Sequence, residues 1–145
     1  VWCHWETARY MLWAVTESEA AAKERMERTI AFQQSHHAWL VVEKESGKAI
    51  GFAGLREESG VCEDTGIAVG PRYVGKGYGT EILNELVRIA KEGLNAHGFI
   101  ATCRSENEAS RKMILGCGFR FSHAEPRVDK RNGEKYTLEF YRKEL

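Results

Sequence analysis

The stretch Val69-Gly-Pro-Arg-Tyr-Val-Gly-Lys-Gly-Tyr-Gly-Thr-Glu81 joins a short apolar strand to an amphipathic helix and decides how the whole chain is interpreted. Gly75, Gly77 and Gly79 carry no side chain that would shield the backbone N–H groups around them. The helix that follows adds free N–H groups and the positive end of its dipole. The stretch therefore predicts an anion site, most naturally for phosphate, although the glycines could also serve only as turn and cap residues.

The segment after these glycines has the periodicity of a helix with one buried face. Apolar residues recur at helical spacing from Ile82 to Leu94, with polar and charged residues between them. Lys76 is followed by Gly77, so the Gly-Lys-Ser/Thr ending of a nucleotide P-loop is missing. A dinucleotide-binding domain, which predicts affinity for NAD, is a weak alternative because residues 95–98 look like a turn rather than the end of a second strand.

The composition limits the classes of function that the chain can have. Its 145 residues are enough for one domain, and its 21 basic and 21 acidic residues cancel, which argues against a nucleic-acid partner. No apolar run is long enough to span a bilayer and no signal peptide is recognisable, so we expect a cytoplasmic protein without a membrane partner. The four cysteines form no Cys-x-x-Cys pair, which predicts reduced thiols and no metal site. His36 and His37 have no metal-ligand partner at a suitable spacing.

The segments before the glycine stretch predict a helix and then an antiparallel meander. A helix is expected from Thr16 to Phe32. Strands are expected at Trp39–Glu43, Ala49–Arg56 and Val61–Val69, joined by turns. Phe99–Cys103 is a further strand, and a strand, helix and strand in succession predict that it lies parallel to the third one.

The C-terminal third predicts a short helix and a hairpin. The helix covers Glu106–Leu115, with Asn107 as its N-cap. The hairpin is expected to pair Arg127–Lys130 with Lys135–Tyr141 through a turn at Arg131–Glu134, in which Asn-Gly suits a type I′ geometry.

Two motifs in this order resemble the GNAT superfamily of acyl-CoA-dependent N-acyltransferases. The first is a strand, Pro71, the stretch Gly75-Lys-Gly-Tyr-Gly-Thr-Glu81 and a helix. The second is Glu106-Asn-Glu-Ala-Ser110 followed by Gly118-Phe119, which is most similar to the branch of ribosomal-protein N-terminal alanine and serine acetyltransferases. The resemblance implies a mixed α/β fold, in which an antiparallel meander and a splayed parallel strand pair are flanked by helices.

This resemblance covers nearly the whole chain. It implies a single acyl-CoA N-acyltransferase domain over residues 1–145. Members of the branch usually begin with a strand and part of a helix ahead of the segment that Arg9–Trp13 resembles. The alternative is therefore that such a strand and helix are missing from this chain.

The resemblance implies acetyl-CoA as a co-substrate and no metal. The pyrophosphate would lie on the N–H groups of the glycine stretch, and the pantetheine arm would bond between the two parallel strands like an added strand. Asn107 and Ser110 match positions that face the pantetheine, with capping alone as the other explanation. The expected cofactor-binding residues are Ile67, Ala68, Val69, Val74, Gly75, Lys76, Gly77, Tyr78, Gly79, Thr80, Asn107 and Ser110.

The same resemblance implies Glu63 and Ser110 as catalytic residues. Glu63 matches the position of a general base in histone-acetylating relatives, and Asp64 matches an acid common in the closer branch. Because these neighbours on a strand point to opposite faces, at most one faces the acetyl group, and it would act through water. Many relatives reprotonate the departing thiolate with a Tyr where this chain has Ile114, so Ser110 or water would have to serve.

The function implied is direct acetyl transfer to a primary amine by a monomer or homodimer. The amine could belong to a small molecule or a protein N-terminus. The acceptor pocket is expected from Trp2–Trp13, Gln33–His37 and Arg127–Lys135. A non-catalytic acyl-CoA-binding module of the same fold is the alternative, because Ile114 replaces the usual Tyr.

Overall fold

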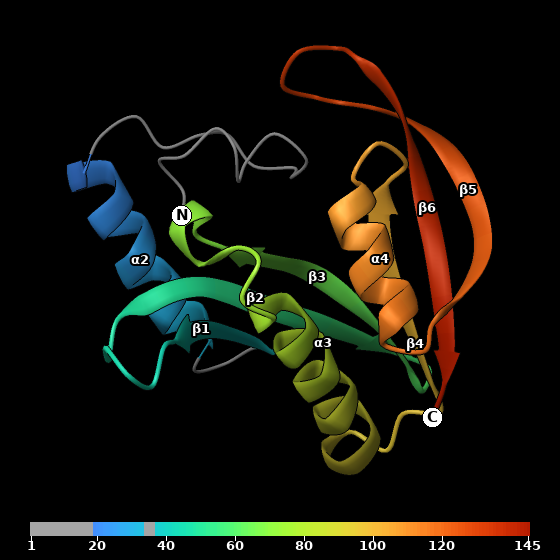
Figure 1. Cartoon of the computed structure of the whole chain (residues 1–145), viewed down its shortest axis with the longest axis horizontal. Coiled ribbons are helices and arrows are strands. Elements are labelled where there is room, and N and C mark those ends of the chain that lie inside the picture. Colours follow the sequence, from blue (N-terminus) through green and yellow to red (C-terminus); the bar gives the residue numbers. More distant parts are fainter. Residues whose placement is uncertain (1–18, 34–36) are drawn as a thin grey trace.

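The computed structural model describes residues 19–33 and 37–145, which build a six-stranded sheet with helices packed on it (Figure 1). The sheet has the order β1-β2-β3-β4-β6-β5, and only the β3–β4 pair is parallel. The predicted mixed α/β fold, with its meander and one parallel pair, is therefore confirmed. The strands are β1 (Ala38–Val42), β2 (Ala49–Glu58), β3 (Val61–Val69), β4 (Gly98–Arg104), β5 (Arg120–Val128) and β6 (Lys135–Glu144).

Within residues 19–33 and 37–145, three α-helices flank this sheet. Helix α3 (Tyr78–Arg88) packs on β2 and β3, and α4 (Glu108–Gly116) packs on β4 and against α3. Helix α2 (Glu19–Gln33) contacts β1, at the end of the sheet opposite the β5–β6 hairpin (Figure 1). Among the described residues, no helix is long and apolar enough to cross a membrane.

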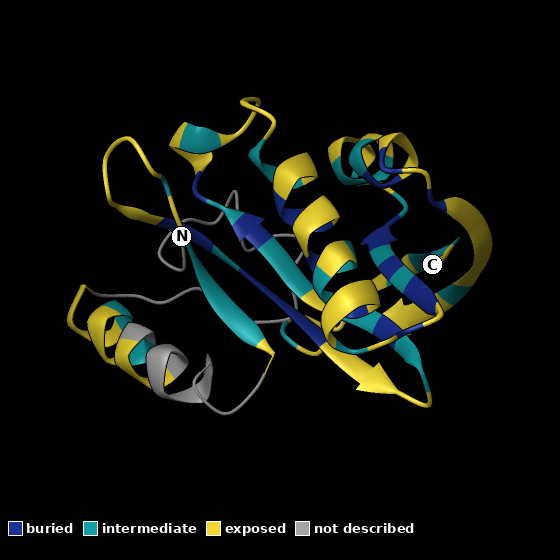
Figure 2. Cartoon of the chain, turned by 90° about the horizontal axis from the view of Figure 1, so that it is seen from below, coloured by how far each residue is buried: buried dark blue, intermediate teal, exposed yellow. Residues whose placement is uncertain are grey.

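The predicted amphipathic helix is confirmed as α3. Ile82, Leu83 and Leu86 are buried, while the opposite face is exposed to solvent (Figure 2). The helix continues into a π-helical turn, η2 (Ile89–Gly93), which ends near the expected Leu94. The buried face of α3 therefore covers β2 and β3 next to the glycine stretch.

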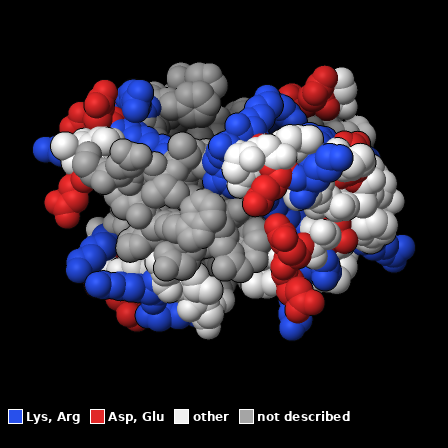
Figure 3. Space-filling model, turned by 90° about the horizontal axis from the view of Figure 1, so that it is seen from above, with Lys and Arg blue, Asp and Glu red and all other residues white. Residues whose placement is uncertain are grey.

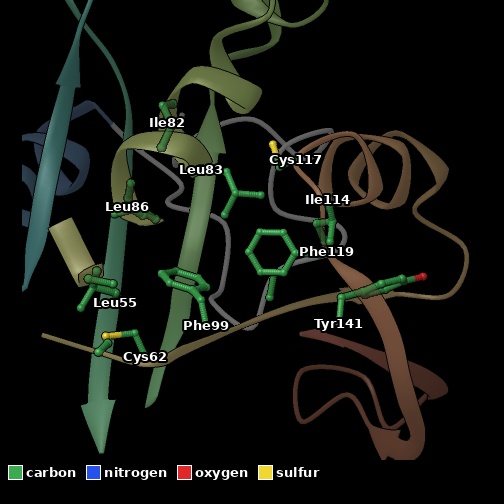
Figure 4. Close-up of a cluster of buried hydrophobic side chains, with 14 of the residues drawn as sticks. Leu55, Cys62, Ile82, Leu83, Leu86, Phe99, Ile114, Cys117, Phe119 and Tyr141 are labelled. Atoms are coloured by element: carbon green, nitrogen blue, oxygen red, sulfur yellow. The ribbon is translucent and has the colours of Figure 1, made fainter. Parts of the chain in front are cut away.

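The core lies between α3, α4 and the sheet. Phe99 and Phe119 meet edge to face at a centroid distance of 5.8 Å, the geometry that aromatic quadrupoles favour. Leu83 and Ile114 complete this cluster and are almost fully buried (Figure 4). The three described cysteines, Cys62, Cys103 and Cys117, are buried free thiols. The core therefore fixes α3 and α4 relative to the two parallel strands.

Two of the hairpin turns differ in type. The β2–β3 connection has positive φ at both Ser59 (52°) and Gly60 (81°), as a two-residue type I′ turn requires. In the C-terminal hairpin only Gly133 has positive φ (74°), so the predicted type I′ turn there is wrong. That loop is wider because the Asp129 carboxylate accepts the backbone N–H of Arg131 and organises it.

The first arm of this hairpin is also longer than predicted. Strand β5 spans Arg120–Val128 instead of Arg127–Lys130. Most of its residues are exposed, so the strand lacks the alternating hydrophobic signal from which an arm can be recognised. Pairing with β6, rather than burial, makes it a strand.

Candidate functional site

The glycine stretch forms an open loop ahead of α3. A 3-10 turn, η1 (Pro71–Tyr73), leads into Gly75 and Gly77, whose φ angles of 84° and 82° are left-handed. Among the described residues, a Cβ added at either glycine would meet no atom within 4 Å. Gly77 is the N-cap of α3, and no side chain of the described residues caps this helix. Within the described part of the chain, the first N–H groups of α3 thus have no side-chain partner and lie beside open space, as a phosphate site requires.

The remaining residues of the glycine stretch are either exposed to solvent or lie close to a neighbouring side chain. Val74 is 65% exposed, and the Lys76 ammonium lies 5.6 Å from the centroid of the Tyr73 ring. Thr80 is exposed on the first turn of α3. A side chain at Gly79 would come within 2.7 Å of the Met113 sulfur on α4, so a glycine there allows the two helices to approach.

Tyr78 anchors the loop to the rest of the domain. Its hydroxyl donates a hydrogen bond of 2.7 Å to the Glu43 carboxylate, at the β1–β2 turn. This bond raises the pKa of Tyr78 to about 12 and lowers that of Glu43. Tyr78, the first residue of α3, is thus held in place through its side chain. Its backbone N–H is not used in this contact and can bind an anion.

Strands β3 and β4 separate beside this loop. They pair only from Val61 to Glu63, opposite residues 98–100, and diverge beyond that point. A bulge in β3 adds one residue between Asp64 and Gly66, which increases the local twist. The gap opens toward the N-terminus of α3.

The backbone of Ile67 and Val69 faces this gap. Gly70 donates to the Ile50 carbonyl, so by the antiparallel alternation Ala68 also bonds to β2, through Phe52. The N–H and C=O groups of Ile67 and Val69 point the other way, where β4 no longer pairs with them. Among residues 19–33 and 37–145, the backbone groups of Ile67 and Val69 on this side thus have no strand partner. Ala68 is buried and its backbone is used within the sheet.

The start of α4 forms the opposite wall of the gap. The Asn107 side chain accepts the backbone N–H of Ser110 at 3.2 Å, which confirms the predicted N-cap. Ser110 lies beside the buried thiol of Cys103 and lines the same cavity as Asn107. Burial raises the pKa of the Cys103 thiol to about 11, and the charge of Glu139 raises it further. The thiol is therefore protonated and uncharged at neutral pH where it lines the cavity. Asn107 and Ser110 can therefore form the helix cap and contact a ligand in the cavity at the same time.

Asp64 lies where the two strands part. Its carboxylate accepts the backbone N–H of Thr102 at 3.0 Å. Burial raises the pKa of Asp64 to about 7, opposed by the Thr102 hydrogen bond and reinforced by the charge of Glu63. A carboxyl group with this pKa is half ionised near neutral pH, which suits a general base.

Glu63 has a different environment. Its carboxylate pairs with Arg56 at 2.6 Å, and the two residues face each other across β2 and β3. This contact raises the pKa of Arg56. Both Glu63 and Asp64 line one cavity, but strand alternation places Asp64 on the face of buried Cys62 and Glu63 on the other face.

That cavity has a volume of about 500 Å³ and passes through the gap between β3 and β4. On the helix side it reaches Ser110, Met113 and Ile114. On the opposite side it reaches Thr102 and Arg104 of β4, as well as side chains from the β5–β6 hairpin. The cavity is therefore lined by side chains from both faces of the sheet.

Some predicted site residues are not tested by this geometry. The expected acceptor segment Trp2–Trp13, and residues 34–36 of the expected Gln33–His37 segment, lie outside the described residues. The hairpin Arg127–Lys135 contributes Arg127 to the cavity. Within residues 19–33 and 37–145, no group of His, Cys, Asp or Glu could hold a metal ion.

The sequence did not identify the part of the cavity that lies on the hairpin side of the sheet. Arg104, Tyr136, Leu138 and Phe140 line it. Tyr136, Leu138 and Phe140 alternate along β6, and Leu138 pairs with Arg104. The period-2 spacing on β6 was the available signal, but it does not reveal which face meets a cavity.

The residues present fit acetyl-CoA. Open space in front of Gly75 and Gly77 can take a pyrophosphate, and the unpaired backbone of Ile67 and Val69 can bond an extended amide-bearing arm. The cavity of about 500 Å³ beside these groups can take an acetyl group.

Comparisons with known proteins agree with this geometry. The model of the acetyltransferase (GNAT) domain matches residues 1–120. An acetyltransferase of the GNAT family from Bacillus anthracis is 18% identical and superposes with a TM-score of 0.82, covering 98% of this chain and 83% of that one.

Two further solved structures are similar. One, from Salmonella typhimurium, is described as an acetyltransferase with its cofactor acetyl-CoA; it is 22% identical, with a TM-score of 0.71, covering 97% of this chain and 81% of that one. The other is a ribosomal-protein-alanine N-acetyltransferase from Brucella melitensis, 22% identical with a TM-score of 0.69, covering 92% and 83%. At these low identities the solved structures show only that the fold is shared. The family model matches most of the sequence and shows the family. The chain belongs to the GNAT acetyltransferase family.

Proposed function

We propose that this protein transfers the acetyl group of acetyl-CoA directly to a primary amine. The observation that carries this proposal is the backbone of Ile67 and Val69, which faces a gap without a strand partner in the described residues, next to the glycine loop that follows β3. A gap of this kind binds an extended amide chain by main-chain hydrogen bonds. The loop holds the anionic end through N–H groups of residues 74–80.

Bound acetyl-CoA supplies a thioester, whose carbonyl carbon the amine attacks while the C–S bond breaks and a thiolate leaves. The N–H of Ile67, free of sheet partners, is placed to donate to the acetyl oxygen and stabilise the charge that develops there. Asn107 and Ser110 orient the arm from the α4 side. These residues provide positioning and electrostatic stabilisation.

We assign deprotonation of the amine to a carboxylate of β3. Asp64 has the stronger support, because it lies at the apex of the gap and its pKa of about 7 lets it accept a proton near neutral pH. Glu63, the residue predicted from the sequence, lines the same cavity but is engaged by Arg56. Transfer through a bridging water reaches the amine from either residue.

We assign reprotonation of the thiolate to Ser110 or water. Ile114, at the position of the Tyr in many relatives, is 2% exposed and belongs to the core, so it offers no proton. The Ser110 hydroxyl lies on the cavity wall and can donate. A thiol with an ordinary pKa near 8.5 is in addition a tolerable leaving group.

A non-catalytic acyl-CoA-binding module is the second candidate, favoured by Ile114 alone. The deciding experiment measures thiol release from acetyl-CoA by the protein with a panel of small primary amines and short peptides. Amine-dependent release, with the acetylated product identified by mass spectrometry, supports catalysis. Binding of acetyl-CoA without transfer to any amine supports the module.

The acceptor stays within two proposed classes, a small-molecule amine or a protein N-terminus. Over the described part of the face shown in Figure 3, basic and acidic side chains are interspersed, in keeping with zero net charge. A charged polymer is therefore a poor candidate partner. A cytoplasmic location, a single domain and a monomeric or homodimeric state also stay predictions.

A further inference from the structure

The glycine loop has a backbone that can adopt many conformations. Gly75 and Gly77 are both left-handed, and each lies beside open space in the described part of the chain. Glycine loses more conformational freedom than any other residue when a chain becomes ordered. A loop of this kind binds an anion weakly unless other contacts already hold it in the binding conformation.

One side chain of this loop is bound to a distant part of the sheet. The Tyr78 hydroxyl donates to the Glu43 carboxylate at 2.7 Å, and the two residues are 35 positions apart in the sequence. Within the described part of the chain, no other side-chain hydrogen bond joins residues 74–79 to another element. The loop therefore depends on Glu43 for its polar attachment to the domain.

Glu43 is itself held firmly in the β1–β2 turn. Its backbone N–H donates to the Lys48 carbonyl at 2.9 Å, and its own carbonyl accepts the Gly47 N–H at 2.8 Å. Hydrogen bonds from Tyr78 and then Ser46 lower the pKa of the Glu43 carboxyl, which is therefore ionised at neutral pH. Glu43 thus offers a fixed, charged acceptor, and a hydrogen bond to such an acceptor is stronger than one between neutral groups.

A second residue of the loop also interacts with Glu43. The positive charge of Lys76 adds to the lowering of the Glu43 pKa, and the Lys76 ammonium lies 5.6 Å from the centroid of the Tyr73 ring. Lys76 and Tyr78 are the two neighbours of Gly77, the N-cap of α3. Glu43 therefore acts on both sides of the residue at which the helix begins.

The charge of Glu43 and its hydrogen bond have opposite consequences for an anion at this loop. A carboxylate close to a phosphate site repels the phosphate, so its charge alone lowers affinity. The hydrogen bond to Tyr78 holds the loop in place, which raises affinity by reducing the freedom lost on binding. Variants that remove the charge and the bond separately can therefore distinguish the two effects.

We propose that Glu43 is a positioning residue for acetyl-CoA, which holds the glycine loop in its phosphate-binding conformation through the hydroxyl of Tyr78. This inference rests on the proposed binding of acetyl-CoA at that loop. Glu43 acts from the β1–β2 turn and touches neither the thioester nor the amine. Its effect is confined to the pyrophosphate end of the cofactor, because the pantetheine arm binds to the backbone of Ile67 and Val69.

The test measures the affinities of coenzyme A and of pantetheine, which keeps the amide-bearing arm but lacks the pyrophosphate. Titration calorimetry gives the affinity of coenzyme A, and competition with coenzyme A gives that of pantetheine. Tyr78→Phe removes only the hydroxyl, Glu43→Ala removes the acceptor, and Glu43→Gln keeps an acceptor without the charge. Glu45→Ala is the matched control, because Glu45 is an exposed acid of the same turn whose charge also acts on Tyr78, although the hydroxyl donates to Glu43.

We expect Tyr78→Phe and Glu43→Ala each to weaken coenzyme A binding by about tenfold, the scale of one charge-assisted hydrogen bond. The double variant should bind no more weakly than either single variant, because both remove the same bond. Glu43→Gln should restore most of the affinity, and Glu45→Ala should bind at least as well as wild type. Pantetheine should bind equally to all of these proteins, a result that general damage to the fold would not give.

Three outcomes would overturn this inference while leaving the proposed function intact. They are unchanged coenzyme A affinity in Tyr78→Phe, an equal loss of affinity for pantetheine, and additive losses in the double variant. Weaker coenzyme A binding in both single variants, with no transfer of acetyl to any amine by wild type, would support the positioning role and contradict the transferase. Wild type that binds no coenzyme A would overturn both. Thermal unfolding without ligand confirms that each variant is folded.

Discussion

The carboxylate of Asp64 accepts the backbone N–H of Thr102 at 3.0 Å. This contact lies one residue beyond the last paired position of β3, Glu63. A side chain thus takes the place of the next ladder bond and satisfies a backbone donor that the separation of the strands would leave free. Asp64 thus stabilises the point at which β3 and β4 separate, and its carboxyl group lines the gap.

This relationship predicts how the rate of acetyl transfer depends on pH. Asp64 must be ionised to act as a base, and its pKa is raised to about 7, so kcat/KM should rise through pH 7. Asp64→Asn should remove that inflection and slow transfer by about 10²-fold or more. Glu63→Gln is the matched control. An inflection lost in Glu63→Gln and kept in Asp64→Asn would make Glu63 the base.

Asp64 also predicts a pH dependence of stability. Its pKa is higher in the folded protein than the ordinary value of 3.8, so the folded state holds the proton more tightly. This contribution is fully present below pH 4 and is lost as the pH rises through 7. The neutral Asp64→Asn, which keeps an acceptor for Thr102, should be more stable than wild type at pH 8 by about 1–3 kcal/mol. Urea unfolding at pH 5 and pH 8 measures this difference, and no change with pH would contradict it.

Asp129 should have the opposite pH dependence. Arg131, followed by Arg104, holds the pKa of Asp129 well below its usual range. The stability that this carboxylate adds is present above its unfolded pKa and is lost as the pH falls below about 4. At pH 7, Asp129→Asn should cost about 3–5 kcal/mol, because it leaves Arg104 buried without its partner.

Glu106→Gln is the control for this prediction. Glu106 is the exposed acid 3.8 Å from Arg104, and its loss should cost less than about 1 kcal/mol. Thermal unfolding at pH 7 compares the two variants. Equal effects would show that the buried Asp129 pair is not what stabilises the hairpin turn.

Ser110 can be tested without disturbing the helix cap. The cap bond uses the backbone N–H of Ser110, so Ser110→Ala should keep the cap and lose only the hydroxyl. If the hydroxyl protonates the thiolate, kcat should fall by about 10²-fold with little change in KM for acetyl-CoA. Ser122→Ala, on exposed β5, controls for non-specific effects. A normal kcat in Ser110→Ala would assign this step to water.

Most of the fold could be predicted from the sequence because its signals are local. The spacing of Ile82, Leu83 and Leu86 predicted a helix with one buried face, and the glycines ahead of it predicted an open loop. Asn107 was recognised as a cap from its position alone. Strand β5 was underestimated because its exposed residues carry no periodic pattern.

The site could be predicted only in part, because it depends on contacts between distant segments. The pairing of Asp64 with Thr102 joins residues 38 positions apart, and nothing local distinguishes Asp64 from Glu63 as the residue held at the gap. The cluster of Arg104 and Asp129 likewise depends on the register of the C-terminal hairpin, whose turn type was predicted wrongly. Burial and shared partners, which decide charge balance and pKa, have no sequence signature of their own.

The central claim is that the open glycine loop holds the anionic end of acetyl-CoA. Titration calorimetry of wild type, Gly77→Asp and Gly77→Ala with acetyl-CoA tests it most directly. Both variants force a side chain into the left-handed conformation of Gly77, but only Gly77→Asp places a negative charge in front of the loop. The account predicts binding by wild type, weaker binding by Gly77→Ala and loss of binding in folded Gly77→Asp. Binding to Gly77→Asp with the affinity of wild type would contradict it.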